Sequence, residues 1–250
     1  MVIFSKKGIL IDNKIIKKEF FISDLLKYSE DFGVFLLIDK PKDWTSFDIV
    51  AKIRNLTKIK KIGHAGTLDP LATGLLILAL GRKATREIDK FRELRKKYLA
   101  EIKLGATTKS DDAEFDEENI QDVGDISEQV LNTTVSKYLG KIEQLPPVFS
   151  AQKVSGKPAY KSARKNKDVE LRLKEVEIFS IEIKRIYLPF ISLKIECSKG
   201  TYIRSLARDI GKDLGCGAYL SDLRRTNIGD YRVENSFDIN EFTDISKLSV

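Results

Sequence analysis

The chain is predicted to fold as an α+β protein built around a mixed sheet. Segments in which apolar and polar residues alternate, typical of half-buried strands, occur beside segments with apolar residues at helical spacing. Strands and helices do not follow one another in strict alternation, which favours the α+β class. With 250 residues, 42% of them hydrophobic, the chain is long enough to bury a substantial core without disulfides or a metal.

The chain divides into an N-terminal extension, residues 1–32, and a main domain, residues 33–250. The extension alternates short apolar and basic groups and has no long period. Lys6 and Lys7 interrupt its apolar residues before a secretory signal could form. The longest apolar run of the chain, Leu75–Leu80, is far shorter than the roughly 18 residues of a membrane span. These features predict a protein without a membrane segment. The only cysteines, Cys197 and Cys216, have no paired metal or redox spacing, which fits a reducing cytoplasm best.

Two short apolar runs are predicted to be buried strands, with a helix between them. The first, Gly33–Ile38, ends before Pro41, which cannot donate to a strand ladder. The second, Leu75–Leu80, is closed by Gly81. Thr45 can cap the helix. The apolar residues that predict this helix recur at helical spacing: Ile49, Val50, Ile53 and Leu56.

Two further strands and two further helices are expected in the second half of the chain. Tyr98–Leu104 and Ile191–Cys197 alternate apolar and polar residues, and Tyr98 falls on the apolar face. Helices are predicted to end at Gly140 and Gly215. Their apolar residues are Val130, Leu131, Val135 and Leu139 in the first helix, and Ile203, Leu206, Ala207, Ile210 and Leu214 in the second.

The charge distribution favours a polyanionic partner. The net charge is +7, and residues 52–61 and 153–167 carry five and six basic residues without an acid. Phosphate backbones attract such stripes whatever the nucleotide sequence. On charge alone, solvated lysine-rich faces remain the alternative interpretation.

The segment Gly63–Gly74 is the strongest candidate for chemistry. It places the only histidine, His64, and Asp69 in a glycine-rich loop between two apolar elements. Glycines let a ligand approach, and a carboxylate on a short loop can be held against a reacting carbon. Asp69 would need a fixed cation beside it, for which Arg204, just past a strand end, is a candidate. The plainer alternatives are an Asp-Pro turn and a surface arginine.

A metal site is not predicted. One histidine, two distant cysteines and loop acids do not match the ligand spacing of zinc. Residues 111–118 hold six acids but lack the glycine and the ligand order of a calcium loop, and are interpreted as a solvated loop. Any catalysis should therefore rely on side chains.

Four motifs occur in an order that identifies a family: GHAGTLDPLATGLLILALG, KKYLAEIKLG, PPVFSAQKVSGKPAY and CSKGTYIRSLARDIGKDLGCGAYLSDLRRT. From about Gly33 to the 220s, the chain resembles the TruB family of tRNA pseudouridine-55 synthases. The resemblance implies the pseudouridine synthase catalytic fold, a mainly antiparallel sheet flanked by helices with an RNA-binding cleft. It also implies isomerisation of uridine-55 in the TΨC loop of tRNA to pseudouridine, with no cofactor and no metal.

By this resemblance, Asp69, Tyr98 and Arg204 are the catalytic residues. Asp69 either adds covalently to the nucleotide or abstracts a ribose proton, and both routes stay open. Tyr98 should stack on the target base, and Arg204 should pair with Asp69. His64 should fill the space left by the flipped nucleotide, and Leu223 should lie near the pocket.

The resemblance also implies contacts to the RNA. Lys40 belongs to a short family motif beside the site, and the stretch with Lys153, Lys157 and Lys161 resembles a segment that grips RNA. The expected partner is the TΨC arm of tRNA, bound by a monomer. About 25 residues follow Arg225, too few for the RNA-binding PUA domain common in the family. A non-catalytic RNA-binding or RNA-folding module and a related synthase acting on another RNA remain the alternatives.

Overall fold

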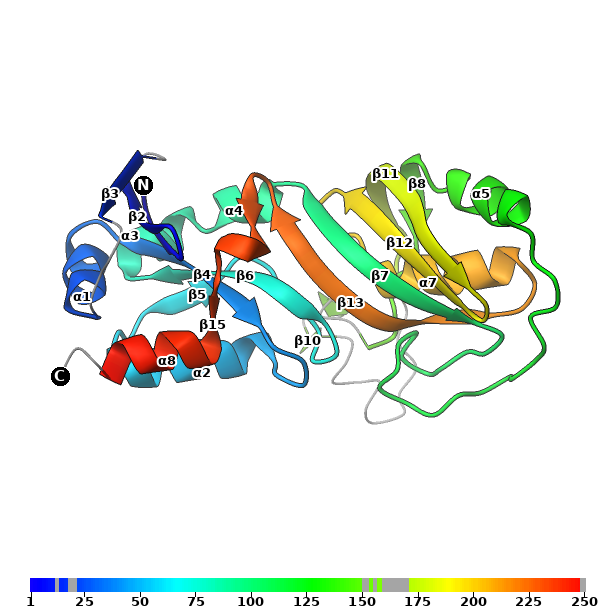
Figure 1. Cartoon of the computed structure of the whole chain (residues 1–250), viewed down its shortest axis with the longest axis horizontal. Helices are drawn as coiled ribbons and strands as arrows, with labels where there is room; N and C mark the ends of the chain where they lie inside the picture. Colours follow the sequence, from blue (N-terminus) through cyan, green and yellow to red (C-terminus); the bar gives the residue numbers. More distant parts are fainter. Residues whose placement is uncertain (12–13, 18–21, 150–152, 155–156, 159–170, 248–250) are drawn as a thin grey trace. The chain divides into compact units, whose positions relative to one another are not determined.

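The computed structural model describes residues 1–11, 14–17, 22–149, 153–154, 157–158 and 171–247. The chain forms two compact units (Figure 1). Unit 1 consists of Met1–Lys96 and Arg224–Val250, and unit 2 consists of Lys97–Leu223. Each unit contains helices on a mainly antiparallel sheet, so the predicted α+β class is confirmed.

The sheet of unit 1 is built around the antiparallel pair β4 (Val34–Lys40) and β6 (Thr73–Leu80). Its other strands are β1 (Val2–Ser5), β2 (Gly8–Ile11), β3 (Lys14–Lys17), β5 (Ile62–His64), the last part of β13 (Ala218–Ile228), β14 (Tyr231–Arg232) and β15 (Phe237–Asp238). β1 lies parallel to β4, and β13 lies parallel to β6. β5 pairs antiparallel with β6. Both apolar runs of the first 100 residues are thus buried strands, as predicted, and they lie in the centre of this sheet.

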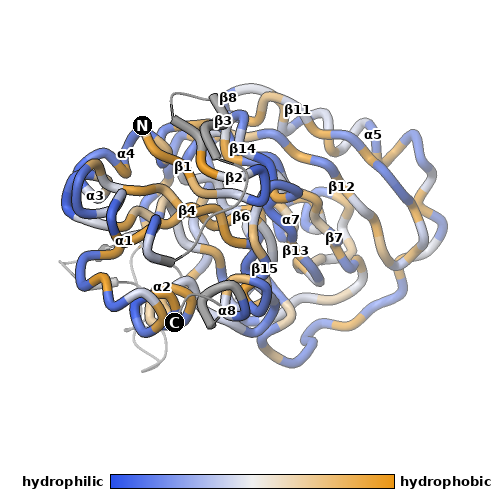
Figure 2. Tube along the Cα trace, turned by 60° about the vertical axis from the view of Figure 1, so that its left-hand side comes forward, coloured by the Kyte–Doolittle hydropathy of each residue, from blue (hydrophilic) through white to orange (hydrophobic). Residues whose placement is uncertain are grey.

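Helices cover both faces of this sheet. They are α1 (Ile22–Asp31), α2 (Ser46–Thr57), α3 (Arg82–Glu87), α4 (Asp89–Glu93) and α8 (Ile239–Lys247), besides a 3₁₀ turn (Val233–Asn235). Leu36 and Ile38 are buried with residues of α1, α2 and α8, whereas Phe35 and Leu37 are buried with residues of α3 and α4. Figure 2 shows the resulting hydrophobic stretches along β4 and β6. Because both faces are covered, these strands are apolar without alternation.

The first 32 residues contribute to unit 1. β1 pairs with β4, and Phe4, Ile9 and Leu25 are buried in the same core as Leu36. The strands of this segment have only four residues each and α1 has ten, which explains why the sequence shows no long period there. The boundary between an extension and the family domain at residue 33 stays a prediction.

The sheet of unit 2 has the strand order β13-β7-β12-β11-β8. Its strands are β7 (Lys96–Leu104), β8 (Gly140–Gln144), β11 (Lys174–Tyr187), β12 (Phe190–Cys197) and the first part of β13; β9 (Lys153–Val154) and β10 (Lys157–Pro158) form a separate pair. β11 pairs antiparallel with both β12 and β8. The helices α5 (Glu128–Ser136) and α7 (Ile203–Asp213) complete the unit.

Most predicted element boundaries are confirmed, and two details are corrected. Thr45 caps α2 in a capping box with Asp48, and β7 buries alternate residues, Tyr98 among them. However, α5 ends at Ser136, and Gly140 begins β8 instead. The prediction that residues 111–118 form a solvated loop is wrong at Asp112, whose exposed fraction is 2%. None of the described helices has the length and hydropathy needed to cross a bilayer.

Candidate active site

The loop between β5 and β6 carries Asp69, and its backbone is tied down from several sides. Within the loop, the Ala72 amide donates to the Asp69 carbonyl over 3.1 Å. The Ser46 hydroxyl, fully buried at the start of α2, accepts from the Leu68 amide at 3.0 Å. The Asp43 amide donates to the Pro70 carbonyl at 2.9 Å. The Asp69 side chain itself is only partly buried.

Lys40, at the end of β4, is a fully buried lysine beside this loop. Its ammonium donates to the carbonyls of Pro41 at 2.8 Å, Trp44 at 2.6 Å and Pro70 at 3.2 Å. Burial lowers the pKa of Lys40 to about 8, and the nearby Asp69 carboxylate opposes this shift. Lys40 therefore links the end of β4 to the residue that follows Asp69 and adds a positive charge near the Asp69 carboxylate.

Arg225, in the part of β13 that belongs to unit 1, supports the same loop from the other end. Its guanidinium donates to the carbonyls of Leu75 at 2.8 Å and Gly66 at 3.2 Å, and the residue is only 2% exposed. Gly74 has φ +105°, and a Cβ added there would lie 2.3 Å from the Arg225 carbonyl oxygen. Only glycine permits this close approach of the two strands. Arg225 was not predicted as a site residue, although it lies within the motif segment LSDLRRT.

His64 ends β5, just before this loop, and presents a neutral aromatic ring. Its ring packs edge-on against Phe47, with centroids 5.4 Å apart and planes at 89°. Phe47 is 70% exposed at the start of α2. Burial and the cations Arg92 and Arg225 lower the pKa of His64. An uncharged imidazole beside an exposed phenyl ring is a surface on which a nucleobase could stack.

In unit 2, Arg204 is held in place at the start of α7. Its guanidinium donates to the carbonyls of Ser110 at 3.1 Å and Phe149 at 3.0 Å. It also lies 3.4 Å from the Asp112 carboxylate, and both side chains are buried, with exposed fractions of 5% and 3%. The Ser110 hydroxyl donates to the same carboxylate. Asp112 was not predicted as a site residue, because it is one of six acids in a segment that resembles a solvated loop.

The neighbouring acid, Asp111, forms a second pair with α7. Arg208 lies 2.9 Å from its carboxylate. Burial raises the pKa of Asp111, while Arg208 and Arg204 oppose the shift. Two consecutive acids of the loop thus bind two arginines spaced one helical turn apart, which aligns the loop with α7.

The predicted site residues fall into both units. Asp69, His64 and Lys40 belong to unit 1. Tyr98, 9% exposed in β7, Arg204 and Leu223, 6% exposed in β13, belong to unit 2. The pairing of Arg204 with Asp69 stays a prediction.

The predicted RNA-gripping lysines are only partly covered by the structure. Lys153 lies in β9 and Lys157 lies in β10, but the structure describes only the backbone of these two residues. Lys161 is not among the described residues. Among the described residues, no group of three or more histidine, cysteine or acidic side chains could hold a metal ion.

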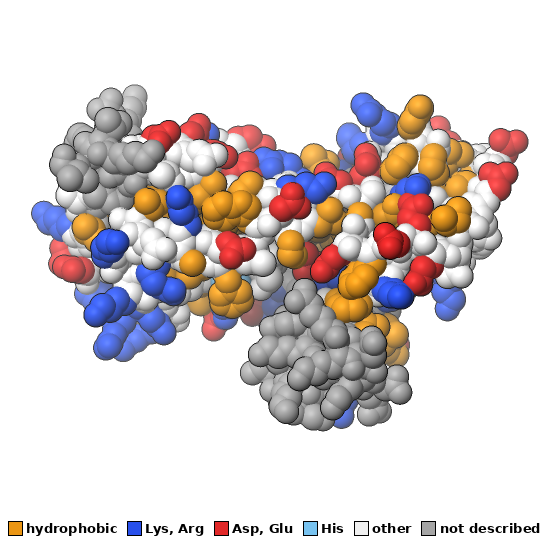
Figure 3. All heavy atoms as spheres, turned by 90° about the horizontal axis from the view of Figure 1, so that it is seen from below, with side chains coloured by type: hydrophobic (Ala, Val, Ile, Leu, Met, Phe, Trp, Pro, Cys, Tyr) orange, Lys and Arg blue, Asp and Glu red, His pale blue; other side chains and the backbone are white. Residues whose placement is uncertain are grey.

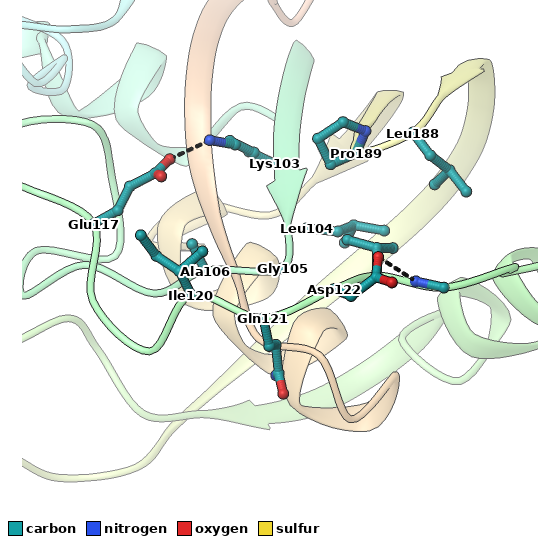
Figure 4. Close-up of a pocket in the computed structure, with 12 residues that line it drawn as sticks. Lys103, Leu104, Gly105, Ala106, Glu117, Ile120, Gln121, Asp122, Leu188 and Pro189 are labelled. Atoms are coloured by element: carbon teal, nitrogen blue, oxygen red, sulfur yellow. Dashed lines mark hydrogen bonds and ion pairs between the residues drawn. The ribbon is translucent and has the colours of Figure 1, made fainter.

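Unit 2 also contains a cavity of about 340 Å³ at the end of β7. Figure 4 shows Lys103, Glu117 and Asp122 among the residues that line it. The Lys103 ammonium is bound to the Glu117 carboxylate, which also accepts from the Tyr219 hydroxyl at 2.6 Å. The cavity includes none of the predicted site residues, and its cation already has an acidic partner.

Comparison with known proteins shows the family. Residues 54–203 match the model of the TruB family pseudouridylate synthase N-terminal domain, and residues 204–249 match the tRNA pseudouridylate synthase B C-terminal domain. The chain belongs to the TruB family of pseudouridylate synthases. The resemblance noted in the sequence is thereby confirmed, and the TruB family is a family of enzymes.

Relatives of this TruB family chain cover most of its length. The tRNA pseudouridine synthase B of Phocaeicola vulgatus is 48% identical over 217 residues, which cover 84% of this chain and 92% of that protein. The protein of the same name from Chloroherpeton thalassium is 45% identical over 214 residues, covering 84% of this chain and 88% of that protein.

Solved structures with the same fold include larger proteins. The chain matches one from a Cbf5-Nop10-Gar1 complex with a TM-score of 0.67 and 27% identity, covering 90% of this chain and 58% of that one. It also matches a chain from an H/ACA RNP bound to a substrate RNA containing 2′-deoxyuridine, with a TM-score of 0.65 and 27% identity. This match covers 88% of the present chain and 55% of the solved one. This chain therefore spans just over half the length of those solved chains, and the likeness supports the pseudouridine synthase fold.

Proposed function

We propose that this TruB family protein converts uridine-55 in the TΨC loop of tRNA to pseudouridine. Family membership and two relatives named tRNA pseudouridine synthase B support the reaction and the class of RNA. The proposed active species is a monomer in the cytoplasm, and the proposed reaction uses no cofactor.

The observation that carries the proposal is the way in which the Asp69 loop is fixed. Ser46, Lys40 and Arg225 reach this loop from α2, β4 and β13, and each binds its backbone. A carboxylate on a loop anchored in this way keeps its position without a metal, as a nucleophile or base requires. Because the three protons of the buried Lys40 ammonium go to carbonyls, its proposed role is to position Asp69 rather than to contact RNA.

The reaction moves a ribose from one atom of uracil to another. The bond from C1′ to N1 breaks, a bond from C1′ to C5 forms, and the proton on C5 is replaced by a proton gained at N1, so nothing is oxidised or reduced. Asp69 could promote the first step by adding to the nucleotide or by removing a ribose proton. Either route requires the carboxylate to be ionised, which the positive charge of Lys40 favours.

The other predicted site residues have roles around the uridine. Tyr98 stacks on the target base, and Arg204 pairs with Asp69. A base stacked inside a folded loop cannot expose its glycosidic bond, so the nucleotide is flipped out. His64 occupies the vacated space, since a neutral ring with its pKa lowered stacks on bases without bringing a charge into the gap. Leu223 lines the pocket.

Substituting the nucleophile tests the proposal. Asp69→Asn should bind tRNA and produce no pseudouridine above background, as mapped by carbodiimide treatment and primer extension at position 55. Asp230→Asn, the same change at an exposed turn of unit 1, is the control and should modify tRNA at the wild-type rate.

The same assay distinguishes the alternatives. Modification by Asp69→Asn at the wild-type rate would refute the role of Asp69. Wild-type protein that binds tRNA but modifies no RNA would indicate a non-catalytic RNA-binding or RNA-folding module. Faster turnover on other RNA hairpins than on a TΨC stem-loop would indicate a different RNA substrate.

A further inference from the structure

Unit 1 contains a positively charged groove whose lining includes none of the predicted active-site residues. It lies between α1, the loop after α2 and the start of α3, and its volume is about 840 Å³. We call it the basic groove. Its lining includes Leu26, Ser29, Glu30, Leu56, Thr57, Lys58, Ile59, Lys60, Lys61, Gly81, Arg82, Lys83 and Arg86.

The lining of the basic groove is strongly positive. Six of its residues are Lys or Arg, all exposed, and one is acidic. Among the described residues, no carboxylate lies within ion-pair distance of any of the six, in contrast to Lys103 in the cavity of unit 2. In Figure 3, Lys and Arg side chains gather at the left of the view, where unit 1 lies. Six exposed cations around one concave surface favour an anion with several negative charges.

Backbone contacts fix the segments of chain that carry these cations. Lys58 ends α2 in the left-handed conformation, φ 59°, and its amide donates to the Arg54 carbonyl at 2.8 Å. The Gly81 amide donates to the Lys61 carbonyl at 2.9 Å. A Cβ at Gly81 would lie 2.3 Å from the Ser29 carbonyl oxygen, so α1 and the start of α3 meet closely there.

The floor of the groove is apolar. Leu26, Leu56 and Ile59 are partly buried, and the last two pack against the core of unit 1. Cations around an apolar floor suit a chain of phosphodiesters, whose sugars present carbon-rich faces between charged phosphates. A small inorganic anion would contact the cations but would leave the apolar floor without a partner.

The groove lies at the opposite end of β6 from the Asp69 loop. Thr73 begins β6 directly after that loop, while Leu80 ends it beside Gly81. The eight residues of β6 span seven steps of roughly 3.3 Å, or about 23 Å. An RNA that reaches both places must extend at least about 23 Å from the modified uridine.

We propose that the basic groove binds the phosphate backbone of the RNA substrate outside its target stem-loop. This inference rests on the proposed function, because it assumes that the substrate is an RNA as large as tRNA. It assigns the stripe of residues 52–61 seen in the sequence to RNA binding and brings α1, from the first 32 residues, into the same surface.

The test measures how RNA affinity depends on salt. In the triple variant Lys60→Ala, Lys61→Ala, Arg86→Ala, the slope of log Kd against log salt for full-length tRNA should fall by about 2 to 3, because each lost phosphate contact removes about 0.7 to 0.9. The matched control, Lys137→Ala, Lys141→Ala, Lys184→Ala, removes three cations that each have an acidic partner, and its slope should equal that of the wild type.

The isolated TΨC stem-loop serves as a second reference, because it lacks the RNA outside the target stem-loop that the groove is proposed to bind. An unchanged slope for tRNA, an equal fall in the control variant, or an equal fall with the stem-loop would each overturn the proposal. Binding is measured at equilibrium and does not require turnover. A protein that makes no pseudouridine yet shows the predicted fall for tRNA would refute the proposed function and leave the groove assignment standing.

Discussion

Unit 1 holds the Asp69 loop through cations that donate to backbone carbonyls, whereas unit 2 holds Arg204 through an ion pair with a buried carboxylate. Lys40 and Arg225 bind the carbonyls of Pro70 and Gly66. In unit 2, Asp112 offers Arg204 a full negative charge at 3.4 Å.

This difference determines how much stability each unit loses when one of these side chains is substituted. Removing a donor to a carbonyl leaves a neutral group unsatisfied, whereas removing one member of a buried ion pair leaves a charge without compensation. Unit 2 should therefore be the more sensitive of the two to single substitutions at these positions.

The largest effect is expected from Arg204→Met. The buried Asp112 carboxylate would lose its guanidinium partner, and the free energy of unfolding should fall by about 3 to 5 kcal/mol in urea denaturation. Changing Asp112→Asn in the same protein should recover part of this loss, because the uncompensated charge disappears.

The control for this prediction is Lys137→Met, which breaks an ion pair of 3.3 Å with exposed fractions of 57% and 36%. Pairs of this kind contribute only about 0 to 1 kcal/mol. Equal destabilisation by Arg204→Met and Lys137→Met would show that burial does not distinguish the two pairs, and the comparison between the units would fail.

A smaller loss is expected where unit 1 depends on close packing. Gly74→Ala places a Cβ 2.3 Å from the Arg225 carbonyl oxygen and forces alanine to adopt φ +105°. The free energy of unfolding should fall by about 3 kcal/mol, and pseudouridine formation should slow as the Asp69 loop shifts. Gly124→Ala, at φ +62° with open space around it, should lose only about 1 kcal/mol by the same measurement. Equal losses would mean that the strand contact does not anchor the loop.

The smallest effect on stability near neutral pH should come from Lys40→Met. Three carbonyls lose their donor, which should lower the free energy of unfolding by about 1 to 3 kcal/mol. Lys42→Met, at an exposed position two residues away, should change it little. Lys40→Met also removes the hydrogen bond to the Pro70 carbonyl, next to Asp69. The substitution should therefore lower kcat more than it changes the Kd for tRNA.

The pH dependence of stability provides a check specific to Lys40. Burial lowers its pKa from 10.5 in the unfolded chain to about 8 in the folded one. Between these values the unfolded state binds more protons, so the contribution of Lys40 to stability should rise with pH over this window. The difference in unfolding free energy between wild type and Lys40→Met should therefore increase from pH 7.5 to pH 10. Parallel pH profiles would contradict a buried, charged Lys40.

The sequence by itself determined the local structure and the family. Apolar runs and alternation predicted β4, β6, β7 and β12, and Thr45 predicted the start of α2, because these patterns depend on short-range periodicity and capping. The motif around Asp69 predicted the family through residues that are adjacent along the chain.

The tertiary structure alone decided which side chains support the predicted ones. Arg225 lies 159 positions from Gly66, and Arg204 lies 94 positions from Ser110. Contacts of this separation leave no periodic signal, since they arise only when strands pair and helices pack. For the same reason Asp112 resembled a solvated acid in the sequence, although an arginine from α7 makes its burial possible.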